Sequence, residues 1–167
     1  LLESVDDPDF SKQWGLLNTN YSNIDISAVE AWKMSTGEGV TIAVVDEGID
    51  MSHPDLNDNI HPLSYDTETS TSPSQLYGYH GTHCAGIAGA EANNLFIRGV
   101  APDAKLMSVS NKLFGPTMSI QLAAGINWAW KNGADIISCS WGTSEADAIK
   151  EALDSALLYG RNGKGAI

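Results

Sequence analysis

The most informative stretch of this 167-residue chain is Val40-Thr41-Ile42-Ala43-Val44-Val45-Asp46. Its β-branched and almost continuously apolar residues are typical of a strand that is buried on both faces of a parallel sheet. Two further strand patterns, at residues 105–110 and 134–139, alternate with helical patterns at residues 80–92, 118–131 and 145–158. This alternation predicts an α/β fold in which a parallel sheet carries helices on both faces.

The segments outside this pattern indicate how the chain is organised. Residues 1–39 are irregular and polar, with a short helix expected near residues 26–34, and we interpret them as an N-terminal arm. Residues 50–79 are rich in Pro, Ser and Thr and predict a long surface loop. Residues 160–167 form a glycine-rich turn that leads into another apolar run, so we expect a sheet that is incomplete at the C-terminus.

Composition excludes several classes of partner. Acidic residues outnumber basic ones 21 to 9, and the resulting net charge of -12 repels nucleic-acid phosphates and anionic membrane surfaces. No apolar stretch is long enough to span a bilayer. The two cysteines, Cys84 and Cys139, are too few for a disulfide framework, and we expect both to be buried thiols. The sequence therefore predicts a folded protein that binds neither nucleic acid nor membranes.

Two residues stand out as candidates for chemistry. Asp46 ends the first strand, and sites in open α/β sheets form at the carboxyl ends of strands. Alone, such an aspartate is more often a turn or helix cap. His80 begins a helix crowded with Gly and Ala, where a rigidly held imidazole suits a general base. A dinucleotide-binding protein is excluded because no glycine fingerprint follows the first strand.

Three motifs carry a resemblance to a known family. They are Val44-Val45-Asp46-Glu47-Gly48-Ile49-Asp50, His53-Pro54-Asp55-Leu56 and His80-Gly81-Thr82-His83-Cys84-Ala85-Gly86. In this order they closely resemble the subtilisin-like and kexin-like serine proteases, the subtilases. Further matches extend the likeness over residues 40–167, which the resemblance identifies as the N-terminal part of a subtilisin-like peptidase domain. A weaker likeness is present in Asp7-Pro8 and in Gln13-Trp14-Gly15-Leu16.

The resemblance implies a serine endopeptidase with an Asp-His-Ser triad. Asp46 would orient His80, and His80 would take a proton from the serine that attacks the peptide carbonyl. By the same resemblance, Ser140, Trp141 and Gly142 would bind an extended polypeptide substrate, although Trp141 is equally a candidate core residue. The family further implies a secreted or exported protein, whose partners include its own C-terminal half or a pro-segment.

The nucleophilic serine has no convincing counterpart in this chain. Gly142-Thr143-Ser144-Glu145-Ala146 superficially resembles the family's nucleophile motif, but it directly follows the substrate-binding segment, and we interpret Thr143 or Ser144 as a helix cap. The oxyanion-hole asparagine is also missing. We therefore expect the isolated chain to be inactive, and the alternative is a non-catalytic fragment or pseudoprotease half that binds peptide or a complementary chain.

Calcium is the one cofactor that the resemblance suggests. Asp55 matches a ligand position of many subtilases, and Gln13 together with Asn93 in the 91–97 loop resembles the rest of a structural calcium site. Phe96 departs from the family pattern, because a glycine is usual at that position. A catalytic role for the nearby thiol of Cys84 is a further alternative, which we set aside because we expect Cys84 to point away from His80.

Overall fold

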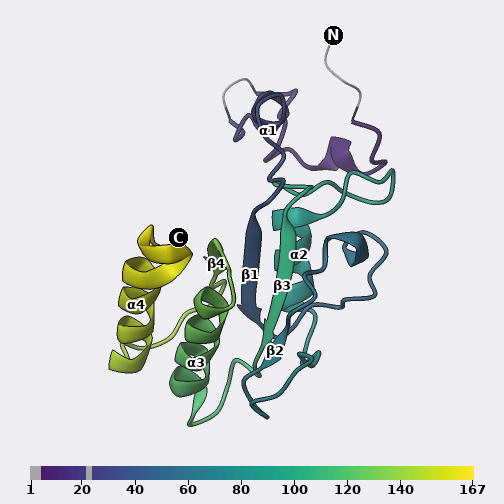
Figure 1. The fold of residues 1–167 in the computed structure, drawn as a ribbon. Helices are drawn as coiled ribbons and strands as arrows, with labels where there is room; N and C mark the ends of the chain where they lie inside the picture. Colours follow the sequence, from purple (N-terminus) through teal and green to yellow (C-terminus); the bar gives the residue numbers. More distant parts are fainter. Residues whose placement is uncertain (1–4, 22–23) are drawn as a thin grey trace.

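The computed structural model describes residues 5–21 and 24–167 (Figure 1). Its centre is a four-stranded parallel sheet in the order β2-β3-β1-β4. The strands are β1 (Thr41–Asp46), β2 (Tyr65–Asp66), β3 (Lys105–Ser110) and β4 (Ile136–Ser138). The helices are α1 (Ala28–Trp32), α2 (His80–Gly89), α3 (Met118–Lys131) and α4 (Asp147–Gly163), with 3-10 turns at Phe10–Lys12 and Asn57–Asn59.

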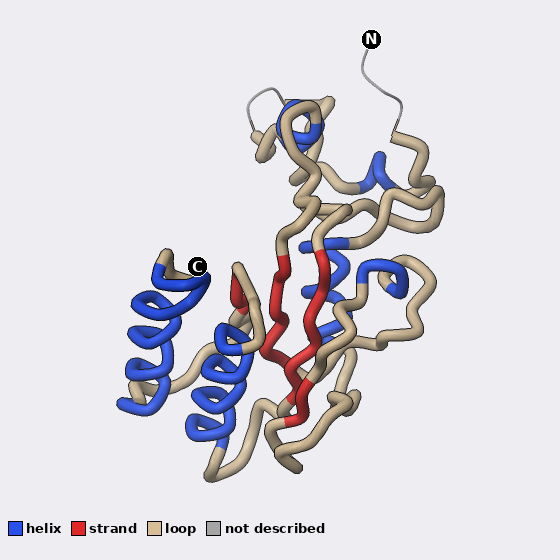
Figure 2. Tube along the Cα trace, viewed as in Figure 1, coloured by secondary structure: helices blue, strands red, loops and turns tan. Residues whose placement is uncertain are grey.

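Helices cover both faces of the sheet, as the sequence predicts. Helix α2 lies against one face, whereas α3 and α4 lie side by side on the other (Figures 1 and 2). Strand β1 alternates between the two layers, because Ile42 and Val44 pack with the α2 side while Ala43 and Val45 pack with the α3 side. The α/β fold with a parallel sheet is thus confirmed. None of the helices among the described residues has the length and apolar character needed to cross a bilayer.

The loop predicted at residues 50–79 is more ordered than expected. It contains β2, which pairs with β3 in the register Tyr65↔Val109, and the ring of Tyr65 stacks on Trp128 with a centroid distance of 5.1 Å. A strand of two residues is too short to give a periodic signal, so the prediction missed it. Hydrogen bonds through this loop fasten it to the sheet, and it leads directly into α2.

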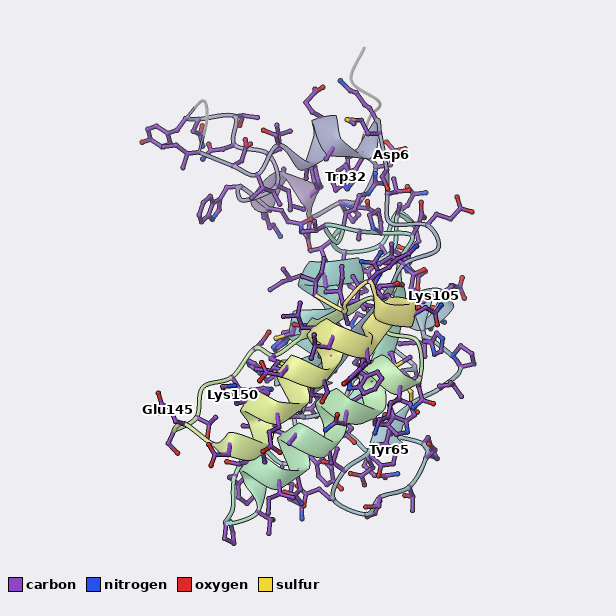
Figure 3. The ribbon with its side chains drawn as sticks, turned by 60° about the vertical axis from the view of Figure 1, so that its left-hand side comes forward. Asp6, Trp32, Tyr65, Lys105, Glu145 and Lys150 are labelled. Carbon is purple, nitrogen blue, oxygen red and sulfur yellow. The ribbon has the colours of Figure 1, made fainter. Side chains whose placement is uncertain are left out.

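The end of the described chain differs in detail from the prediction. Helix α4 runs to Gly163 but is broken by non-helical residues at 160–162, and Ala146 precedes it without any side-chain cap. The prediction that Thr143 or Ser144 caps this helix is therefore wrong, because the helix begins only at Asp147. Glu145 lies on the exposed connection before it (Figure 3). Ile167 hydrogen bonds with β4, donating to the Asp135 carbonyl and accepting from Ile137.

Residues of the N-terminal segment form a small core of their own. Phe10, Leu16, Ala28 and Val29 are buried together. The indole N–H of Trp32 donates to the Val100 carbonyl at 2.8 Å and joins this segment to the loop after α2, at the junction visible in Figure 3. The segment therefore packs against residues 91–103 and leaves the carboxyl edge of the sheet open.

Candidate active site

Asp46 is the last residue of β1 and lies at the carboxyl edge of the sheet. Its side chain is fully buried, and the Glu47 N–H donates to its Oδ1 at 2.7 Å. The carbonyl of Asp46 accepts the N–H of Asn111, which follows β3, at 2.8 Å. The Glu47 N–H therefore orients the buried carboxylate, and the Asn111 N–H fixes the main chain that carries it.

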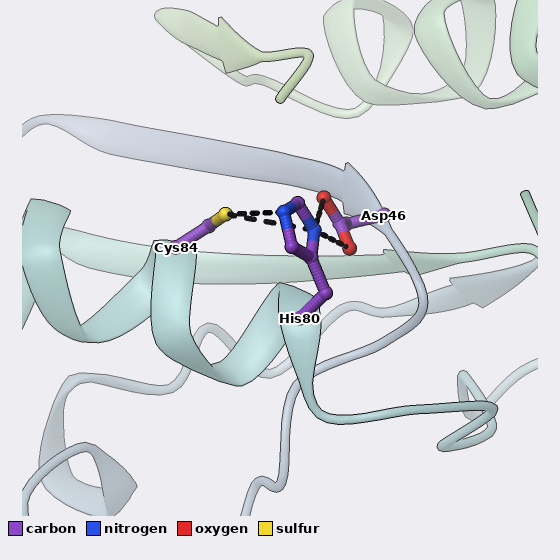
Figure 4. Close-up of side chains that lie close together, drawn as sticks. All are labelled: Asp46, His80 and Cys84. Atoms are coloured by element: carbon purple, nitrogen blue, oxygen red, sulfur yellow. Dashed lines mark hydrogen bonds and ion pairs between the residues drawn. The ribbon is translucent and has the colours of Figure 1, made fainter. Parts of the chain in front are cut away.

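His80 is the first residue of α2, and its ring meets this carboxylate. Its Nδ1 lies 2.9 Å from both oxygens of Asp46 (Figure 4). The hydrogen bond and the charge of Asp46 raise the pKa of His80 above its ordinary value; desolvation opposes this rise, and the charge of Glu47 adds a still smaller contribution to it. Half of the His80 side chain is exposed, at 49%. The imidazole is thus held at one nitrogen and open to solvent.

Glycine allows the two segments to approach this closely. A side chain at Gly81 would collide with the carbonyl oxygen of Gly48 and would come within 3.1 Å of the Asp46 Cβ. Gly81 is itself buried. The small residues that the sequence places after His80 therefore bring the start of α2 onto the end of β1.

Cys84 lies beside His80, contrary to our prediction. Its Sγ is 3.8 Å from Nδ1 and 3.9 Å from Nε2 of His80. Residues four apart share one helix face, and we misjudged this spacing. Both cysteines are also only partly buried. Burial, with a smaller contribution from the charge of Asp46, raises the pKa of Cys139 to about 11 and makes that thiol unreactive.

The predicted substrate segment follows β4 at the same edge of the sheet. Trp141 is partly buried against the α3 layer, and its indole N–H donates to the Val45 carbonyl at 2.8 Å, one residue before Asp46. Ser140 and Gly142 are exposed. Within the part of the chain that the structure describes, the backbone groups of residues 140–142 form no hydrogen bond with other backbone groups. This segment therefore offers an open main-chain edge beside Asp46.

Ser144 is exposed on the connection to α4. It lines a shallow hollow made by residues 143–153, which includes neither Asp46 nor His80. Among the described residues, the side chains that hydrogen bond with His80 are those of Asp46, Glu47 and Cys84. The geometry among the described residues thus gives Ser144 no base.

The predicted metal ligands lie around the 91–97 loop. Asp55 is 2% exposed; its Oδ2 accepts the Ile97 N–H at 3.3 Å, and its Oδ1 has no hydrogen-bond partner among the described residues. The Asn93 amide donates to the Pro54 carbonyl. Gln13 uses both amide atoms on the backbone of Arg98, so its ligand role stays a prediction.

Two further buried carboxylates, to which the sequence analysis assigned no ligand role, accompany Asp55. Asp7 and Glu91 are 3% and 7% exposed. Asp7 accepts the Asn94 N–H at 2.9 Å and pairs with Arg98 at 2.6 Å. Burial raises the pKa of Asp55, and the charges of Asp7 and Glu91 add to this while the Ile97 N–H opposes it. The weak family likeness at Asp7-Pro8 did not indicate this placement, because only the fold brings Asp7 to this loop.

Comparison with known proteins identifies the family. The model of the subtilase family matches residues 37–167. Kexin from Saccharomyces cerevisiae is 36% identical over 178 residues, covering 98% of this chain and 22% of kexin. A calcium-dependent protease from a Nostoc species is 35% identical, covering 95% of this chain and 27% of that protein. The chain thus spans about a quarter of the length of these relatives.

Solved structures agree with the sequence matches. Fervidolysin from Fervidobacterium pennivorans, described as a keratinolytic enzyme related to subtilisin, superposes with a TM-score of 0.75 at 29% identity, over 93% of this chain and 24% of fervidolysin. A protease from Pseudoalteromonas arctica gives a TM-score of 0.73 at 30% identity, over 90% of this chain and 55% of that one. With the family model matching well over half of its length, this chain belongs to the subtilase family.

Proposed function

We propose that this chain supplies the aspartate and the histidine of a serine endopeptidase. The observation that carries the proposal is the His80 Nδ1 held 2.9 Å from both oxygens of the buried Asp46, while the ring remains half exposed. Its family membership points to the same chemistry. The family resemblance also leads us to propose that the protein is secreted or exported.

In this mechanism the buried carboxylate has two tasks. Asp46 accepts a hydrogen bond from the Nδ1–H of His80, which fixes the tautomer in which Nε2 is unprotonated and able to take the proton of a serine hydroxyl. When His80 becomes positively charged, the adjacent carboxylate stabilises it without being protonated itself. The serine and the oxyanion donor would come from elsewhere in the full-length protein.

The open main-chain edge at residues 140–142 fits a polypeptide substrate. The unpaired backbone groups of residues 140–142 can add an extended peptide to the sheet by main-chain hydrogen bonds, as in other cases of strand addition. The bond from Trp141 to Val45 holds this edge beside Asp46 and His80. A bound peptide would therefore pass the histidine in an extended form.

We expect the isolated chain to be inactive towards serine-directed reagents. A fluorophosphonate probe should leave its intact mass unchanged, because no serine among the described residues contacts His80. The full-length protein should gain one probe mass, and a His80→Ala variant should abolish that labelling. Stoichiometric labelling of the isolated chain at Ser144 would show that our account of this serine is wrong. Absence of labelling in the full-length protein would contradict the proposed function.

We also propose that calcium binds beside the 91–97 loop. Asp55 fits such a role, because its buried Oδ1 lacks a partner and hard oxygen ligands suit this cation. Glu91 would add negative charge beside Asp55, which the bound cation would offset, whereas the charge of Asp7 is already paired with Arg98. Two of the relatives are named calcium-dependent proteases.

The direction in which Asp55→Asn changes the melting temperature, with and without calcium, tests the calcium proposal. Without calcium the raised pKa of Asp55 means that its ionised form is disfavoured in the folded protein, so stability falls as the pH rises through that pKa. At neutral pH in chelator, Asp55→Asn should leave the melting temperature unchanged or raise it. With calcium present, the same variant should lower it. Equal effects in both conditions would contradict the proposal.

A further inference from the structure

Two serines on β3 are buried where the strand pattern calls for apolar residues. Ser108 and Ser110 are both 0% exposed. A buried hydroxyl without a partner is costly, so each must be hydrogen bonded to be tolerated. Neither side chain takes part in the proposed proton transfer.

Ser108 contacts both segments that carry the Asp46–His80 pair. Its Oγ accepts the Ile49 N–H at 3.0 Å, three residues after Asp46. The same oxygen accepts the hydroxyl of Ser74 at 2.8 Å, six residues before His80. One oxygen atom in the sheet therefore ties the segment after the aspartate to the segment before the histidine.

The segment from Ser74 onward is fastened at two further points on its way to His80. The Gln75 N–H donates to Ser110 Oγ at 3.0 Å. The Tyr77 N–H donates to the Glu47 carbonyl at 2.7 Å. The position of the start of α2 relative to β1 therefore depends on a short series of bonds that begins at Ser74, and the loss of the first of them leaves the segment held at Gln75 and Tyr77 only.

We propose that Ser108, together with Ser74, is a positioning pair that sets the alignment of His80 on Asp46. Ser108 lies on β3 and pairs with Val44, two residues before Asp46. Its hydrogen bonds therefore fix both segments relative to the same strand. Displacement of a catalytic group by about 1 Å can cost as much as 100-fold in rate, so a small shift suffices. The kinetic part of this inference rests on the proposed function, whereas its structural part does not.

The test is a double-mutant cycle in the full-length protein. Ser108→Ala should lower kcat about tenfold, equivalent to about 1.4 kcal/mol, with KM unchanged. Ser74→Ala should act in the same direction. Because both changes remove one shared link, the double variant should be no worse than Ser108→Ala alone. Additive losses, or a change confined to KM, would overturn the proposal. Ser74→Ala also serves as the second variant if Ser108→Ala does not fold.

A matched control separates positioning from stability. Thr67 is buried at the same sheet edge, and its hydroxyl donates to the Ser110 carbonyl at 3.0 Å; among the described residues it forms no hydrogen bond with residues 46–49 or 74–80. Thr67→Val should lower stability but leave kcat unchanged. If Ser108→Ala behaves like Thr67→Val, Ser108 is merely structural and the proposal fails.

A spectroscopic readout works even if the protein hydrolyses no peptide. The proton between His80 Nδ1 and Asp46 should give a low-field NMR resonance, which Ser108→Ala should shift or broaden and Thr67→Val should not. An inactive wild-type protein that shows this response would contradict the proposed function and still support the positioning role. An unmoved resonance in Ser108→Ala would overturn it.

Discussion

Asp46→Asn is expected to lower kcat of the full-length protease about 10⁴-fold, because an asparagine amide opposite Nδ1 stabilises the wrong tautomer of His80. The geometry should survive, since asparagine has nearly the shape of aspartate and the Glu47 N–H can still donate to its oxygen. KM should change little. The measurement is steady-state hydrolysis of a peptide substrate, and a loss of less than about tenfold would contradict the assigned role.

The same variant should move the pH profile in a defined direction. Because Asp46 raises the pKa of His80, the unprotonated base forms only as the pH rises through that raised value. Removing the carboxylate's charge should lower the pKa of His80 and shift the acid limb of the remaining kcat/KM profile to lower pH. A limb that moves to higher pH would mean that another group titrates.

A control variant in the same loop is Asp50→Asn. The hydroxyl and backbone N–H of Ser52 lower the pKa of Asp50, and Asp50 makes no contact with His80. Asp50→Asn should therefore leave both kcat and the acid limb within about twofold of wild type. A large effect would mean that the change at Asp46 reports loop disruption and not lost orientation of the imidazole.

Local pattern was sufficient for most of the fold. The apolar run before Asp46 is recovered as β1, and the bounds expected for β3 and α3 agree with the structure. These elements are long enough for burial on one or both faces to leave a recognisable hydrophobic pattern in the sequence. Strand β2 was missed because its two residues are held by Tyr65 stacking on Trp128, a contact between distant segments.

Only part of the site could be predicted from the sequence, because the rest again depends on contacts between distant segments. Asp46 and His80 belong to contiguous motifs, so a resemblance could single them out. Ser108 belongs to none of these motifs, and Asp7 belongs only to a weak one. The importance of Ser108 depends on its contacts with Ile49 and Ser74, and that of Asp7 on its contact with the 91–97 loop. The orientation of Cys84 followed from helix spacing alone and was misjudged.

Gly48→Ala is expected to destabilise the full-length protein by about 2–5 kcal/mol. Gly48 has φ +95°, a conformation that costs an L-residue about 1–2 kcal/mol. In addition, a methyl group at this position would collide with the carbonyl oxygen of Gln75, and such overpacking adds about 1–3 kcal/mol. The collision can be relieved only if residues 75–80 move away from residues 46–49, and this movement should separate His80 from Asp46.

Gly39→Ala separates the cost of the backbone conformation from the cost of the steric collision. Gly39 also has a positive φ, +79°, but an added methyl group there meets nothing within 4 Å. Its cost should be limited to the backbone conformation, about 1–2 kcal/mol. Denaturant unfolding should therefore give a clearly lower midpoint for Gly48→Ala than for Gly39→Ala, and only Gly48→Ala should lose the low-field His80 resonance. Equal midpoints would mean that the close approach of Gly48 to Gln75 does not hold the two halves of the site together, and that the hydrogen bonds between these segments carry their alignment.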